Sequence, residues 1–281
     1  MLEFNKIYNM DCLDGLRLLD DGCIDLTVTS PPYDNLRNYH GYSFDFENIA
    51  RELFRVTKDG GVVVWVVNDA TVKGSETGTS FRQALFFKSI GFKIHDTMIY
   101  AKDSCPFPET KRYYPGFEYM MVFVKGKIKT VHLIKDKPNK HCGDKVSGTE
   151  RQADGTTKKM CAITNNTGRV IQPFGVRLNI WHYQMGYMKS TVDKIAYKHP
   201  AIFPEALAHD HIISWSNPGD VVLDPFMGSG TTAKMAKLTG RQYIGFELSE
   251  EYCQVAEERL ELVSTPLFNL GGNENGQHRA F

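Results

Sequence analysis

The alternation of two kinds of apolar segment constrains the fold of this chain more than any other feature of its sequence. Between residues 5 and 100, short runs rich in β-branched residues alternate with longer segments whose apolar residues recur at helical spacing, and residues 197–262 resume this order. Strands that alternate with helices form βαβ units, which build a parallel sheet covered on both faces. The sequence therefore predicts an α/β fold with a mostly parallel, doubly wound sheet.

Apolar spacing, together with Gly and Pro, places the individual elements. Strands are expected over residues 24–29, 61–67, 95–102, 221–223 and 243–246, and helices over residues 46–56, 80–90, 204–215, 231–239 and 250–260. Residues 263–281 are rich in Gly and Asn, so we expect them to form a flexible tail.

The middle of the chain, residues 104–196, interrupts this alternation. It is rich in Pro, Gly, Thr, Asn and Lys, and only residues 118–125 form an apolar run that should return to the sheet. From Lys102 to Lys198 there are 18 Lys and Arg against 8 Asp and Glu, although the whole chain holds 33 of each kind. We interpret residues 104–196 as an inserted basic region that faces a polyanion, between two halves of one domain at residues 1–103 and 197–262.

A glycine-rich turn, DPFMGSGTT, follows the predicted strand at 221–223. Gly228 and Gly230 allow a tight turn and the close approach of a ligand, and the helix that follows offers free N–H groups. Glu247, at the end of the next strand, can accept hydrogen bonds from ribose hydroxyls. The turn lacks the lysine of a phosphate-binding P-loop, and Ala233 or Lys234 stands where a dinucleotide fingerprint has its third glycine. A nucleoside without a pyrophosphate is therefore the favoured ligand.

The first predicted strand ends in the sequence SPPY, residues 30–33. Proline donates no ladder hydrogen bond and fixes its own φ, so the strand cannot continue through Pro31 and Pro32. In isolation this is an ordinary strand-terminating turn. Ligands bind at the carboxyl ends of the strands in folds of this kind, so we expect residues 30–33 and 224–230 to meet in one crevice.

The SPPY and DPFMGSGT motifs, followed by Glu247, are together similar to those of S-adenosylmethionine-dependent DNA amino-methyltransferases. Their order, with the catalytic motif first, resembles the β group of that family. HPAIFP, residues 199–204, resembles its additional cofactor motif, and NMDCLDGL, residues 9–16, resembles the segment whose acid reaches the adenine. The resemblance spans most of residues 5–262 and implies a Rossmann-like methyltransferase fold with an inserted DNA-recognition region.

The resemblance also implies a role for each matched residue. Ser30 and the Pro31 carbonyl would accept the two protons of a base NH2, Pro32 would stiffen the motif, and Tyr33 would stack on a base that has left the duplex. The residues expected to bind S-adenosylmethionine are Asp11, Cys12, His199, Pro200, Phe203, Asp224, Pro225, Phe226, Gly228, Gly230, Thr231 and Glu247.

The position of the methylated atom follows in part. Methylation of cytosine C5 uses a cysteine that follows proline, but this chain has the reverse order, Cys105-Pro106. An exocyclic nitrogen is therefore the expected target. In the resembled family a serine at the first motif position is found more with cytosine N4, so Ser30 favours cytosine and leaves adenine N6 open. An RNA or protein-glutamine substrate and a non-catalytic DNA-binding module are the remaining alternatives.

Basic residues of the insert are the expected contacts to double-stranded DNA. The candidates are Lys111, Arg112, Lys158, Lys159, Arg169 and Arg177. A cognate restriction endonuclease and a homodimer are left open as further partners. The six cysteines form no CxxC pair, so we expect no metal site. No apolar run approaches the ~18 residues of a membrane span, which favours a cytoplasmic protein, and the resemblance implies a bacterium or phage as its source.

Overall fold

The computed structural model describes residues 2–32, 44–103, 110–145, 149–159 and 170–263. Tyr33, Arg169 and residues 264–281 of the predicted tail lie outside the described residues.

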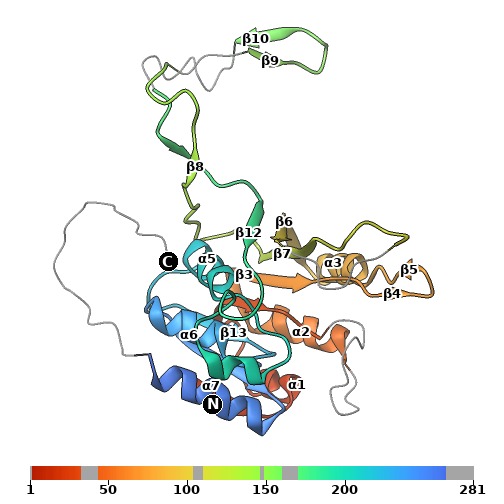
Figure 1. Cartoon of the computed structure of the whole chain (residues 1–281), viewed down its shortest axis with the longest axis vertical. Helices are drawn as coiled ribbons and strands as arrows, with labels where there is room; N and C mark the ends of the chain where they lie inside the picture. Colours follow the sequence, from red (N-terminus) through yellow and green to blue (C-terminus); the bar gives the residue numbers. More distant parts are fainter. Residues whose placement is uncertain (1, 33–43, 104–109, 146–148, 160–169, 264–281) are drawn as a thin grey trace, which may run out of the picture.

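One eight-stranded sheet organises the described chain (Figure 1). Its order is β1 (Lys6–Asn9), β14 (Gln242–Glu247), β13 (Val221–Asp224), β2 (Ile24–Thr29), β3 (Thr57–Val67), β7 (Phe117–Lys125), β6 (Phe92–Lys102) and β12 (Ile180–Tyr183). β7 runs antiparallel to both of its neighbours, and the other pairings in this sheet are parallel. The predicted mostly parallel sheet is confirmed.

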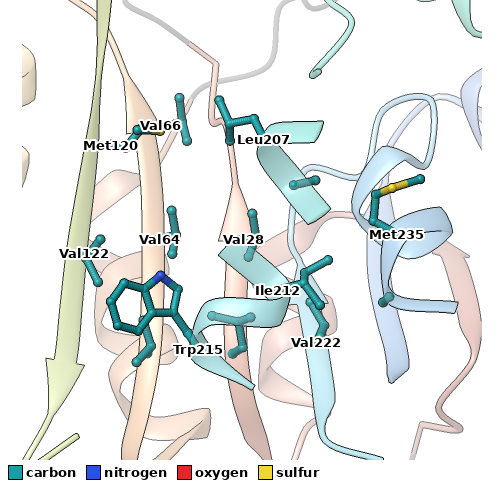
Figure 2. Packing of buried hydrophobic residues seen from close by; sticks show 14 of the residues in the cluster. Val28, Val64, Val66, Met120, Val122, Leu207, Ile212, Trp215, Val222 and Met235 are labelled. Carbon is teal, nitrogen blue, oxygen red and sulfur yellow. The ribbon is translucent and has the colours of Figure 1, made fainter. Parts of the chain in front are cut away.

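Helices cover both faces of this sheet, because its strands carry apolar side chains on both faces. Val62, Val64 and Val66 of β3 face one core, which α5 (Glu205–Trp215) and α6 (Thr231–Leu238) close (Figure 2). Val63 and Trp65 face a second core, which α1 (Cys12–Arg17), α2 (Phe46–Val56) and α3 (Thr79–Ser89) close. Burying one such side chain contributes roughly 1.5–3 kcal/mol, so this double burial fixes the strand register.

The last helix, α7 (Glu250–Glu261), follows β14 and packs against α6, β1 and the short 3-10 helix η1 (Lys194–Lys198). Of the described helices, none is long and apolar enough to cross a membrane.

The expected elements agree with the observed ones to within a few residues at each end, and residues 118–125 return to the sheet as β7. In the main sheet and the α-helices that cover it, β1, α1 and β12 were not predicted. β1 and α1 are short, and the first residues of the chain show no long periodic pattern. β12, within the supposed insert, spans only four residues. Its pairing with β6 places Trp181 in the core, where the side chain is 6% exposed.

A thin basic projection leaves the sheet beyond β7 and returns at β12 (Figure 1). Its described residues, 135–145, 149–159 and 170–176, are called the arm below. β8 (Lys137–Pro138) pairs with β11 (Phe174–Gly175) near its base, and β9 (Thr149–Arg151) pairs with β10 (Thr157–Lys159) further out. The arm is thus shorter than the region 104–196, part of which builds the sheet edge. A separate small hairpin, β4 (Thr71–Val72) with β5 (Ser75–Glu76), follows β3.

Candidate active site

Four neighbouring parallel strands, β1, β14, β13 and β2, end at the same edge of the sheet. Asn9 pairs with Glu247 and Asp224 with Gly245, so the carboxyl ends of these strands are level. Segments predicted from four separate parts of the sequence follow these ends: residues 11–12, 30–32 and 224–231, together with Glu247. The strand order therefore brings the predicted catalytic and cofactor segments to one edge, where open α/β sheets bind ligands.

A hydrogen bond joins β2, the strand that leads to Ser30, directly to the glycine-rich turn. Thr29, the residue before Ser30, donates from Oγ1 to Oδ1 of Asp224 at 2.6 Å, across 195 positions of sequence. Thr232 at the start of α6 donates to the Val28 carbonyl at 3.1 Å. These contacts hold the end of β2, directly before Ser30, against the glycine-rich turn, and a crevice shared by the two motifs stays a prediction.

Asp224 is a wholly buried carboxylic acid in this arrangement. Burial raises its pKa to about 6, against hydrogen bonds to Thr29, Thr232 and the Phe226 N–H that favour the ionised form. Its oxygens serve contacts within the protein, through which Asp224 shapes the turn.

The two glycines of the turn cannot be replaced without strain. Gly228 has φ of 51° and Gly230 has φ of 80°, in the left-handed region that L side chains rarely adopt. A Cβ at Gly230 would lie 2.7 Å from the Cβ of Ala256 in α7, and one at Gly228 would lie 3.2 Å from Nε2 of His199. The backbone thus stays bare beside the start of α6, where first-turn N–H groups point outward.

Glu247 stands at the end of β14 with its carboxylate fixed by the backbone. Oε2 accepts from the Gly228 N–H at 2.8 Å, and Oε1 accepts from the Ser249 N–H at 2.9 Å. Burial raises its pKa, and these N–H donors oppose the rise. Each oxygen keeps a lone pair for a ribose hydroxyl, so the residues present fit the nucleoside part of the cofactor.

The N-terminal acid, Asp11, follows the end of β1, which pairs with the end of β14 at Glu247. Asp11 caps α1, where its Oδ1 accepts from the N–H groups of Leu13 and Asp14, and the Met10 N–H donates to the Glu247 carbonyl at 3.1 Å. Burial raises the pKa of the Cys12 thiol to about 12, so that side chain stays neutral. The other carboxylate oxygen of Asp11 takes no part in this cap.

The HPAIFP segment contributes one side chain beside the glycines. His199 packs edge-on against Tyr252 of α7, with ring centroids 4.4 Å apart, and its Nδ1 accepts from the Ala201 N–H at 3.1 Å. The structure brings His199 to the turn but leaves Pro200 exposed. Phe203 packs against the core, and Phe226 packs against Phe44 and Trp65, so both rings make packing contacts inside the protein.

Comparison with known proteins decides the family. The family described as DNA methylase, of the N6 and N4 methyltransferases, matches residues 24–258. The chain belongs to this family.

Similar proteins support this assignment. The orphan methyltransferase M.BamHII of Bacillus amyloliquefaciens is 61% identical over 245 residues, which cover 86% of this chain and 91% of that one. TTHA0409 of Thermus thermophilus, described as a DNA modification methylase and solved with S-adenosyl-L-methionine, is 25% identical with a TM-score of 0.62, covering 94% of this chain and 95% of that one. The cytosine-N4-specific PvuII DNA methyltransferase, 19% identical with a TM-score of 0.65 and coverage of 92% and 90%, shares the fold.

The protein is thus a DNA methyltransferase whose methyl donor is S-adenosylmethionine. Among the described residues of this methylase, no three His, Cys, Asp or Glu side chains are placed to hold a metal ion.

Two of the predicted DNA-binding residues of the methylase lie at the β4–β5 hairpin, which follows the end of β3, and two lie on the arm. Arg112 donates to the Gly74 carbonyl of the β4–β5 hairpin, and Lys111 beside it is exposed. Lys158 is exposed on β10 of the arm, and Lys159 follows it in the same strand.

Arg177 differs from these residues. Its Nε donates to Asp136 at 2.8 Å, and its Nη1 donates to Asp210 of α5. With both carboxylates so close, the pKa of Arg177 rises even though burial opposes the charged form. These ion pairs place Arg177 at the base of the arm, and its contact with DNA stays a prediction.

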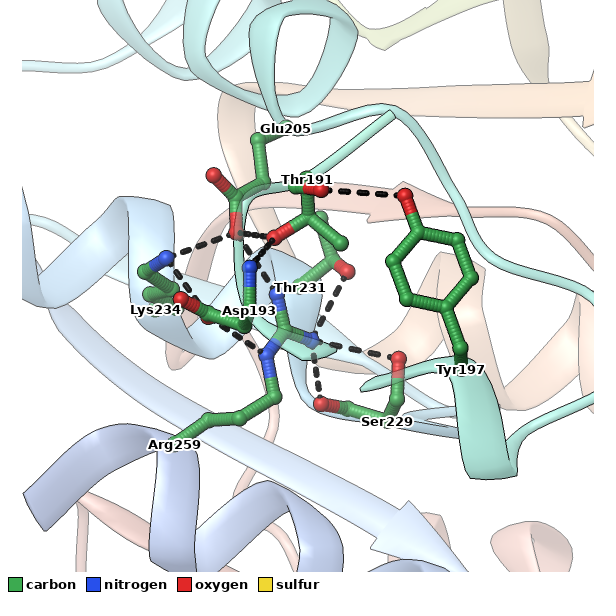
Figure 3. Close-up of polar contacts among 8 residues, drawn as sticks. All are labelled: Thr191, Asp193, Tyr197, Glu205, Ser229, Thr231, Lys234 and Arg259. Atoms are coloured by element: carbon green, nitrogen blue, oxygen red, sulfur yellow. Dashed lines mark hydrogen bonds and ion pairs between the residues drawn. The ribbon is translucent and has the colours of Figure 1, made fainter. Parts of the chain in front are cut away.

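The sequence analysis missed a second arginine of the methylase. Arg259 of α7 is fully buried and reaches the glycine-rich turn, together with Lys234, Asp193 and Glu205 (Figure 3). In the sequence it is one of many charged residues in a helix with a charged face, and no spacing distinguishes it.

Proposed function

We propose that this methylase transfers a methyl group from S-adenosylmethionine to the exocyclic amino group of a base flipped out of double-stranded DNA. Cytosine N4 is the favoured target and adenine N6 the alternative. The observation that carries the proposal is the hydrogen bond from Thr29 to Asp224, because it sets the Ser30 motif directly beside the turn expected to hold the cofactor.

At the catalytic motif, the protein orients the amino group. The Ser30 hydroxyl and the Pro31 carbonyl accept the two amino protons, which directs the nitrogen lone pair away from the base ring and toward the methyl donor. Pro31 is buried and Pro32 is half-buried, so the carbonyl is held rigidly at the end of β2. Tyr33 supplies the stacking surface for the flipped base.

At the cofactor end, the protein binds and aligns. Glu247 accepts hydrogen bonds from the ribose hydroxyls, and Asp11 accepts one from the adenine amino group. The rest of S-adenosylmethionine lies against the backbone of residues 228–231. The bound cofactor supplies an electrophilic methyl group on a sulfonium centre. The new N–C bond forms as the C–S bond breaks with its electron pair going to sulfur. The methylated nitrogen then releases one proton to water through the Ser30 hydroxyl, which can both accept and donate, while the Pro31 carbonyl only accepts a hydrogen bond.

The arm and the segment beside the β4–β5 hairpin provide the DNA contacts in this proposal. Lys135, Lys137, Lys140 and Lys158 are exposed along the arm, where they can neutralise phosphates outside the flipped base pair. Lys111, Arg112, Lys159 and Arg169 stay candidates for the same role. The name of M.BamHII, an orphan methyltransferase, favours an enzyme that acts without a cognate endonuclease, and a homodimer stays a prediction.

Nucleoside analysis tests the proposal. Plasmid DNA methylated by the enzyme is digested to nucleosides and analysed by mass spectrometry, and N4-methylcytosine is the expected product. N6-methyladenine as the product would select the alternative target. In a parallel assay with labelled S-adenosylmethionine, transfer of the label only to RNA or protein would overturn the DNA assignment. Ser30→Ala is expected to lower kcat by about 10²-fold or more, since one preorganised acceptor is lost.

A further inference from the structure

Four charged side chains form a buried cluster under the glycine-rich turn (Figure 3). Asp193 precedes η1, Glu205 begins α5, Lys234 lies in α6 and Arg259 lies in α7. Arg259 has 0% exposure and Lys234 has 8%. The cluster therefore joins three helices and the segment that leads back from the arm.

Hydrogen bonds connect all four members. Arg259 donates from Nε to Asp193 at 2.9 Å and from Nη2 to Glu205 at 2.7 Å. Lys234 donates to both carboxylates at 2.7 Å. Burial opposes ionisation of Asp193, but its bonds to Lys234 and Arg259 lower its pKa overall. Two positive and two negative groups thus balance one another out of water.

The remaining nitrogen of Arg259 holds the turn itself. Nη1 donates to the backbone carbonyl of Ser229, to its Oγ at 3.1 Å and to Oγ1 of Thr231 at 3.2 Å. Ser229 stands between Gly228 and Gly230, two residues with wide conformational freedom. Contacts from outside the turn help to hold such a backbone in one conformation, and Arg259 makes three of them.

The same cluster holds the segment that carries His199. Thr191 donates to Glu205 at 2.6 Å, and Tyr197 donates to the carbonyls of Thr191 and Gly186, both at 3.0 Å. A buried ion pair is weak support for stability because desolvation offsets the attraction, whereas its fixed geometry can specify one arrangement. The cluster is therefore better explained by positioning than by stabilisation.

We propose that Arg259 is a positioning residue for S-adenosylmethionine: through Ser229 and Thr231 it fixes the turn that receives the cofactor. Through Asp193 and Glu205 it aligns that turn with the segment of His199. The inference deepens the proposed function, since it rests on the turn at 228–231 being the cofactor site.

Arg259→Lys tests the proposal because lysine keeps the positive charge but cannot form the planar fork of hydrogen bonds. The measured quantities are the Kd of S-adenosylmethionine by calorimetry without DNA, the KM values for cofactor and DNA, and the unfolding temperature. We expect the cofactor Kd and KM to rise by about tenfold or more, as for lost charge-assisted hydrogen bonds. The KM for DNA and the kcat at saturating cofactor should stay near the wild-type values.

Arg55→Lys is the matched control. Arg55 also makes several bonds, to Glu52, Asp21 and the carbonyls of Leu16 and Leu19, but it lies on α2 outside the site. The Arg55→Lys substitution should lower the unfolding temperature without changing the Kd of S-adenosylmethionine. If Arg259→Lys fails to fold, Glu205→Gln, which keeps an acceptor oxygen, is measured instead.

Cofactor affinity unchanged in the Arg259→Lys protein, or in Glu205→Gln where that variant replaces it, would overturn the positioning role. Failure of the wild-type protein to bind S-adenosylmethionine would instead contradict the cofactor site, so the two failures can be told apart.

Discussion

Asp224 is a single residue whose ionisation links the site to the stability of the protein. Its folded pKa of about 6 lies above the ordinary value of 3.8, so the folded state binds a proton more tightly between these pH values. The free energy of unfolding should therefore fall as the pH rises from 4 to 7, by on the order of 3 kcal/mol at most. Asp224→Asn removes this loss, because asparagine does not ionise.

Denaturant unfolding at pH 4.5 and pH 8 measures this effect. The free energy of unfolding of Asp224→Asn minus that of the wild type should be larger at pH 8 than at pH 4.5. Asp59→Asn, a change at an exposed aspartate, is the control and should show a smaller pH dependence. A stability difference for Asp224→Asn that does not change with pH would contradict the buried, partly protonated carboxyl.

Gly230 allows a second prediction at this scale, because the chain offers a matched glycine. Gly230 and Gly74 have φ of 80° and 81°, but a Cβ at Gly230 would meet Ala256 at 2.7 Å, whereas nothing lies within 4 Å of one at Gly74. Gly74→Ala should cost only the backbone strain, roughly 1–2 kcal/mol. Gly230→Ala should cost more in denaturant unfolding and should also weaken cofactor binding. Equal losses of stability in the two variants would contradict the crowding by α7.

The residues found from the sequence share one property: each belongs to a local motif whose chemistry is visible in a few neighbouring letters. Ser30 and Gly228 are of this kind. Arg259 could not be found this way, because its partners Ser229, Glu205 and Asp193 are separated from it by 30, 54 and 66 positions. Such contacts exist only once the strand order is known.

At the scale of elements, the spacing of apolar residues located most helices and strands but not their order. β2 lies beside β13 in the sheet although they are far apart in sequence, and this adjacency creates the site. β12 was missed because four residues are too few for a periodic signal, and burial of Trp181 against α5 decides its place.

Arg177 links three elements, and its contacts predict the behaviour of the arm. It bonds Asp136 at the start of the arm and Asp210 of α5, and its N–H donates to the Ile134 carbonyl at 2.9 Å. Asp136→Asn separates two explanations by sign. If Arg177 contacts phosphate, loss of the competing carboxylate should strengthen DNA binding. If it holds the base of the arm, the same change should weaken DNA binding, and this is the result that we expect.

Fluorescence anisotropy with duplex DNA at several salt concentrations measures both effects. Arg177→Ala should also weaken binding, but the slope of log K against log salt should stay unchanged, since no phosphate contact is lost. A slope reduced by about 1 would show instead that Arg177 contacts a phosphate.

For the whole molecule, a net charge of zero conceals an uneven distribution, with the basic residues of the arm held away from the sheet (Figure 1). Lys140 and Lys158 are exposed at two positions along the arm. If both contact phosphate, Lys140→Glu with Lys158→Glu should weaken DNA binding and flatten the salt slope by about 2, because two fewer counterions are released. The cofactor Kd should not change, since the arm takes no part in the turn at 228–231. Lys88→Glu on α3 reverses an exposed charge outside the arm and should leave the slope as it is. An unchanged slope in the double variant would show that the arm serves something other than DNA, while the methyl-transfer site at the strand ends would stand on its own contacts.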